Sequence, residues 1–284
     1  MGGRVSRPSE AMCPVALLDV DKTLLFGMDL RGLNVELLEA LKRTGILKVY
    51  LFTDMTIASP AVCERLELLR VLREDHGFDV LGVLTPCDIA WHSLDIDEAV
   101  ALGQMCFEEG LYKGRLFGEE FENFIKGQAS RLPQLAASIS KESIDAKERP
   151  GAAFQEASDV FRREREACGG KAEEVKLPQD LFVKSVVAKA IGDHMAEKRG
   201  LKHVKGLMLD LFLLHRPAFL TATDPVVAFD DNLEVLETLR ARTPLARIQG
   251  MTSVPFHVIH VDGSHVKADA FLKEIKRFLK TVRS

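Results

Sequence analysis

The sequence lacks the excess of basic residues that binding to a nucleic-acid backbone requires. Its 38 lysines and arginines are outnumbered by 42 aspartates and glutamates, which gives a formal net charge of −4. The isoelectric point is near 6.1. Proteins that bind nucleic acid neutralise its phosphates with clustered lysine and arginine. The charge balance therefore argues against nucleic acid as a partner.

Cysteine pairs and long apolar runs are also missing. The five cysteines are an odd number, and no two form a C-x-x-C pair. The sequence thus predicts neither a zinc site nor a redox motif, and favours a reduced, cytoplasmic protein. No run approaches the roughly 20 apolar residues of a membrane span, and the start lacks the apolar region of a signal peptide. The sequence does not predict the oligomeric state.

What is present is the composition of a globular protein, with strand and helix patterns in alternation. Hydrophobic residues make up 46% of the chain and charged residues 28%. Apolar strand patterns occur at 15–21, 49–54, 78–84, 225–231 and 255–261. Helical patterns occur at 34–43, 62–72, 204–214 and from about 266 to the end. This order predicts an α/β fold with a Rossmann-like parallel sheet and right-handed crossovers.

The segment 88–200 differs from the rest of the chain. It is rich in charge, has helical periodicity and few strand-like runs, and is most polar over 138–176. We therefore expect an α/β core formed by 12–87 and 201–284, with 88–200 as an α-helical cap or insertion. The cap cannot come earlier, because only 32 residues separate Asp21 from Thr53.

Acidic residues end two of the predicted strands. Asp19 and Asp21 lie two positions apart, so in a strand both would point to one side of the sheet, near the crevice where α/β folds bind ligands. Asp230 and Asp231 end a later strand in the same manner. Like charges this close invite a hard divalent cation such as Mg²⁺. We predict these four aspartates as metal ligands, and leave open which of Asp230 and Asp231 binds directly.

The order of these motifs resembles the haloacid dehalogenase (HAD) superfamily of phosphohydrolases. Its first motif, D-x-D-x-T, corresponds to residues 19–23, its second, an apolar strand ending in threonine, to residues 49–53, and its fourth, the acidic pair, to residues 226–231. The third motif is a lysine before the helix that feeds the fourth strand. Lys205, 25 residues before Asp230, suits one helix plus one strand, with Lys202 and Lys184 as alternatives. Lys22 departs from the family, in which a small residue is usual there.

The resemblance implies a Mg²⁺-dependent phosphatase with an aspartyl-phosphate intermediate. Asp19 would be the nucleophile and Asp21 the proton donor and acceptor, while Thr53 and Lys205 would hold the phosphoryl group and balance its charge. The substrate would be a small phosphometabolite or a phosphorylated protein side chain. The chain is also similar to HAD-like effector phosphatases of intracellular bacteria, some of which enter host cells and act on phosphotyrosine. The alternative is a catalytically weak scaffold that binds a protein partner through its helical insertion.

Overall fold

Five parallel strands form a single sheet in the order β3-β2-β1-β4-β5. The computed structural model describes residues 12–27, 29–89, 151–178, 180–185, 204–214, 224–242, 254–262 and 267–283. The strands are β1 (Val15–Leu18), β2 (Lys48–Phe52), β3 (Asp79–Leu84), β4 (Val226–Asp230) and β5 (Phe256–His260). Each lies within or beside a strand predicted from sequence, so the Rossmann-like α/β core is confirmed.

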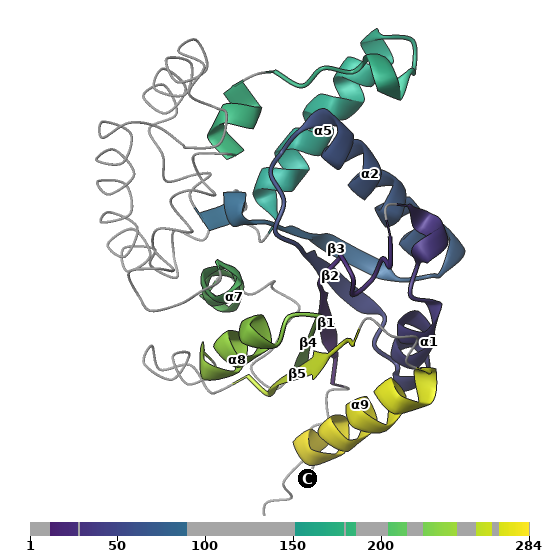
Figure 1. Cartoon of the computed structure of the whole chain (residues 1–284), viewed down its shortest axis with the longest axis vertical. Coiled ribbons are helices and arrows are strands. Elements are labelled where there is room, and N and C mark those ends of the chain that lie inside the picture. Colours follow the sequence, from purple (N-terminus) through teal and green to yellow (C-terminus); the bar gives the residue numbers. More distant parts are fainter. Residues whose placement is uncertain are drawn as a thin grey trace, which may run out of the picture.

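Helices cover both faces of the sheet (Figure 1). The helices are α1 (Val35–Thr44), α2 (Ser59–Arg70, continued by a π-helical turn, Val71–Asp75), α5 (Ala152–Ala167), α7 (Lys205–Leu214), α8 (Leu233–Arg242) and α9 (Ala268–Arg283). Short 3-10 turns lie at Leu30–Gly32, Pro86–Ile89 and Ala172–Glu174. Helices α7 and α8 pack together on one side, and α1 and α9 pack together on the other. No helix in the described part of the chain has the length and apolar character needed to cross a bilayer.

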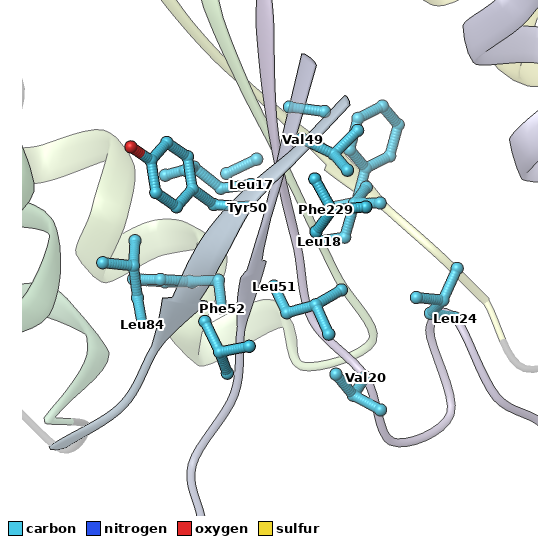
Figure 2. Packing of buried hydrophobic residues seen from close by; sticks show 14 of the residues in the cluster. Leu17, Leu18, Val20, Leu24, Val49, Tyr50, Leu51, Phe52, Leu84 and Phe229 are labelled. Atoms are coloured by element: carbon cyan, nitrogen blue, oxygen red, sulfur yellow. The ribbon is translucent and has the colours of Figure 1, made fainter. Parts of the chain in front are cut away.

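Strand β1 is the centre of the core. It pairs with β2 on one side and β4 on the other, and all four of its residues are fully buried. Because alternate side chains point to opposite faces, Leu17 and Tyr50 lie on one side and Leu18, Val49 and Phe229 on the other (Figure 2). Burial on both faces accounts for the continuous apolar runs seen in the sequence.

Helix α1 is fixed at both ends by capping residues. The Asn34 side chain accepts a hydrogen bond from the Leu37 N–H at 3.1 Å and donates one to the Thr23 carbonyl at 2.9 Å. Gly45 ends the helix in the left-handed region, with φ of 77°. Asn34 therefore caps the helix and also ties down the loop that follows β1.

Part of the predicted insertion packs directly on the core. Helix α5 contacts α2 and β3, and buries Phe154 and Phe161 on its apolar face. The Asp88 carboxylate accepts hydrogen bonds from the Thr85 N–H at 2.8 Å and the Ala153 N–H at 3.2 Å, which joins the end of β3 to the start of α5. Residues 90–150 and 186–203 lie outside the described residues, so the helical cap and the predicted domain boundaries stay predictions.

The approach of α5 to the sheet depends on Gly151, which has φ of 86° and stands so close to β3 that a Cβ would lie 3.0 Å from the Val83 carbonyl oxygen. Gly45 also has a positive φ, but a Cβ there would meet nothing within 4 Å.

We expect Gly45→Ala to lower the free energy of unfolding by about 1 kcal/mol, the cost of the backbone conformation alone. Gly151→Ala should lower it by at least about 2 kcal/mol because a steric overlap is added. Urea titration measures both, and equal losses would contradict the close approach.

Candidate active site

The carboxyl ends of three neighbouring strands bring the candidate residues together. Asp19 follows β1, Thr53 follows β2, and Asp230 is the last residue of β4. The Asp19 N–H donates to the Phe229 carbonyl at 3.0 Å, and the Thr53 N–H donates to the Leu84 carbonyl at 3.1 Å. These bonds continue the sheet ladder by one residue, so the backbone of both residues is fixed by the sheet.

Lys205, the first residue of α7, joins two of these strands. Its ammonium Nζ lies 2.5 Å from Oδ1 of Asp19 and 2.7 Å from Oδ2 of Asp230. The side chains of Lys205, Asp19 and Asp230 are only 8%, 7% and 1% exposed. The other oxygen of Asp230 accepts the Asn232 N–H at 2.9 Å. The result is a buried ion-pair network in which one lysine bridges two carboxylates.

Burial and charge act against each other at this network. Burial raises the pKa of Asp19 to about 6, and the negative charge of Asp230 adds to the rise while Lys205 opposes it. Burial alone would lower the pKa of Lys205, but the charges of Asp19 and Asp230 outweigh it and raise that pKa. The lysine therefore stays charged near neutral pH, and it favours the carboxylate form of Asp19 that nucleophilic attack requires.

A third carboxylate completes the group. One oxygen each of Asp19, Asp230 and Asp231 lies within 4.8 Å of the others, and Asp231 is only half-buried. His260 Nε2 contacts the Asp231 carbonyl at 3.0 Å, which places the end of β5 against this residue. Among the described residues, three carboxylates and one lysine meet here, which gives hard oxygen donors and a net negative charge, and both suit a divalent cation. The residues present therefore fit a metal site, although carboxylates alone do not identify the ion.

The buried hydroxyl of Thr53 adds a polar group to the same edge of the sheet. Its Oγ1 is inaccessible to solvent and has no hydrogen-bond partner in the part of the chain that the structure describes. A buried hydroxyl that makes no hydrogen bond costs about 1 to 3 kcal/mol. A ligand oxygen bound at this edge would remove that cost, which is consistent with the role predicted for Thr53.

The Asp21 carboxylate does not join the group of three acids. Strand β1 ends at Leu18, and Lys22 follows with φ of 62°, so residues 20–25 form a turn. The side chain of Asp21 is 72% exposed and lies 3.6 Å from Nη2 of Arg65, a buried arginine of α2. The expectation that Asp19 and Asp21 share one small volume required the strand to continue to residue 21, and the chain turns before it.

Of the other candidates for the third-motif lysine, the structure describes Lys184. Burial lowers the pKa of Lys184, and the charges that oppose this shift come from Glu156, Asp180 and Cys87. Lys202 lies outside the described residues. Among the described lysines, Lys205 is the one in contact with the acids of β1 and β4, as the spacing predicts.

Comparison with known proteins adds no family to this geometry. No protein-family model, no curated protein and no solved structure matches the chain. The HAD resemblance therefore stays a prediction from the four sequence motifs.

Removal of the Lys205 charge tests the network directly. We expect Lys205→Met to lower the free energy of unfolding by roughly 3 to 5 kcal/mol in metal-free buffer, because two buried carboxylates lose their counter-charge. Urea titration measures the loss, and Lys276→Met, an exposed lysine of α9, is the control.

Adding Asp19→Asn to Lys205→Met should restore part of this stability, because one of the two uncompensated charges is removed. If Lys205→Met unfolds at the same urea concentration as Lys276→Met, the buried network does not stabilise the fold.

Proposed function

We propose that the chain is a Mg²⁺-dependent phosphatase of the HAD superfamily, which hydrolyses a phosphomonoester through an aspartyl-phosphate. The observation that carries the proposal is the buried Asp19 carboxylate held by Lys205, with the carboxylates of Asp230 and Asp231 beside it. A nucleophile, a fixed cation and a set of metal-binding oxygens at the carboxyl ends of a parallel sheet are the parts that phosphoryl transfer needs.

In the first step, an Asp19 oxygen attacks phosphorus, and the bond from phosphorus to the leaving oxygen breaks. The bonding pair stays on the leaving oxygen, which receives a proton from Asp21. Water then attacks the aspartyl-phosphate and gives a proton to Asp21. The electron pair of the phosphorus–oxygen bond returns to Asp19, so both aspartates end as they began.

The surrounding residues stabilise charge rather than make bonds. Lys205 would offset the charge of Asp19 and of the phosphoryl group, and Thr53 would donate a hydrogen bond to a phosphoryl oxygen. Mg²⁺, held by Asp19, Asp230 and Asp231, would supply further positive charge to the phosphoryl oxygens. Because Lys205 and Asp19 are almost wholly buried, these interactions are screened less than they would be in water.

The substrate class follows the sequence-based expectation, a small phosphometabolite or a phosphorylated side chain such as phosphotyrosine. The predicted cap at 88–200 would choose between them by closing over the site. The scaffold alternative is less favoured, because buried charged groups cost folding free energy that a partner-binding surface does not require. The two substrate classes are compared by measuring kcat/KM for a phosphotyrosine peptide and for small phosphometabolites, with p-nitrophenyl phosphate as a general substrate.

The nucleophile is tested with Asp19→Asn. The amide keeps the shape of the carboxylate but is a poor nucleophile, so the turnover of p-nitrophenyl phosphate should fall by roughly 10³-fold or more. Asp79→Asn, at an exposed position of β3, should leave turnover unchanged. Circular dichroism verifies that both variants are folded. Unchanged turnover in folded Asp19→Asn would remove the proposed function.

The metal is tested by removal and replacement. EDTA should abolish activity and Mg²⁺ should restore it, and Asp231→Ala should raise the Mg²⁺ concentration for half-maximal activity on the order of tenfold. Asp231 is the cleaner substitution, because Asp230 also holds Lys205. Glu39→Ala, exposed on α1, is the control. A Mg²⁺-dependent rise in melting temperature, smaller in Asp231→Ala, gives a second measurement. Full activity in metal-free buffer would contradict the metal site.

A further inference from the structure

Helix α2 places a charged side chain on its buried face. Arg65 follows Val62 by three positions and precedes Leu69 by four, so it shares the face that packs on the core. The residue is 8% exposed, and its Nε has no hydrogen-bond partner among the described residues. The sequence signal for it is a lone arginine within an apolar helical stripe.

Stability does not account for this arginine. A buried guanidinium that makes too few hydrogen bonds is costly, and an apolar side chain of similar length would pack without that cost. Arg65 forms an ion pair with Asp21, at an Nη2–Oδ1 distance of 3.6 Å, which is longer than a hydrogen bond. Because the Asp21 side chain is 72% exposed, such a pair adds little to folding.

The pair does restrict where the Asp21 carboxylate lies. The backbone around Asp21 is already fixed, since the Leu24 and Leu25 N–H groups donate to the Val20 carbonyl and Asn34 holds the Thr23 carbonyl. The remaining freedom is in the side chain. An exposed aspartate samples several rotamers, and the Arg65 cation attracts one carboxylate oxygen toward α2.

We propose that Arg65 is a positioning residue that orients Asp21 for proton transfer. The inference rests on the proposed function, in which Asp21 gives its proton to the leaving oxygen as the bond to phosphorus breaks. Arg65 faces Oδ1 of Asp21 from the core side, which leaves Oδ2 for the proton. Arg65 would act through Asp21 and not on the phosphoryl group itself.

The test is the dependence of kcat/KM on the leaving group, across a series of phenyl phosphates that runs from p-nitrophenyl phosphate to unsubstituted phenyl phosphate. A good leaving group departs without a proton, whereas a poor one needs it. We expect Arg65→Met to lower kcat/KM roughly tenfold on phenyl phosphate and less than about threefold on p-nitrophenyl phosphate. Arg65→Lys, which keeps the charge, should give an intermediate loss. Arg70→Met, on the exposed face of α2, should leave the whole series unchanged.

Asp21→Asn should steepen the same dependence further, and adding Arg65→Met to Asp21→Asn should change nothing more, because the arginine acts through the aspartate. The melting temperature of Arg65→Met should be unchanged or higher, since a buried charge is removed. If Arg65→Met does not fold, Arg65→Lys is used instead. The positioning role then requires its kcat/KM to fall more on phenyl phosphate than on p-nitrophenyl phosphate.

The outcomes distinguish failure of the positioning role of Arg65 from failure of the proposed phosphatase function. Equal losses on all phosphates, or no loss on any, would overturn the positioning role of Arg65. If Asp21→Asn steepens the dependence and Arg65→Met does not, the inference fails while the proposed function stands. If the wild type hydrolyses none of the phosphates with Mg²⁺ present, the proposed function fails, and the positioning role fails with it.

Discussion

The contact of the Lys205 ammonium with Asp19 and Asp230 is the interaction on which the rest of the site depends. It joins β1, β4 and α7, although 186 positions of sequence separate Lys205 from Asp19. Two carboxylates at adjacent strand ends repel each other when buried, and a fixed cation between them removes that repulsion. The sheet brings the two carboxylates together, and α7 supplies the positive charge of Lys205 that offsets their repulsion.

Most of this could be predicted from local patterns. The apolar runs predict central strands because both faces of the sheet are covered, and Asn34 and Gly45 mark the ends of α1 by their capping chemistry. Parallel strands end at one edge, so the acids at the ends of β1 and β4 are expected at the same edge of the sheet. The spacing of Lys205 from Asp230 then suited one helix followed by one strand.

Three features of the structure could not be predicted from local sequence patterns. Asp19 and Asp21 would share a side only if β1 continued to residue 21, but the strand ends at Leu18 and the chain turns. Arg65 escaped prediction because a charged residue in an apolar stripe is normally assumed to reach solvent. Helix α5 lies within a polar segment, and its buried face of alanine and phenylalanine becomes evident only when β3 and α2 are placed beside it.

The charge of the site also bears on what it can bind. Among the described residues, Asp19, Asp230 and Asp231 face a single ammonium, so this group of side chains carries a net negative charge. A phosphomonoester is itself anionic at neutral pH, and one lysine does not offset both sets of charge. Burial raises the pKa of Asp19 to about 6, so a further positive charge beside this carboxylate would favour its ionised form. A site that admits a phosphate therefore needs a second cation, and the carboxylate oxygens not already engaged by Lys205 are the groups that would hold one.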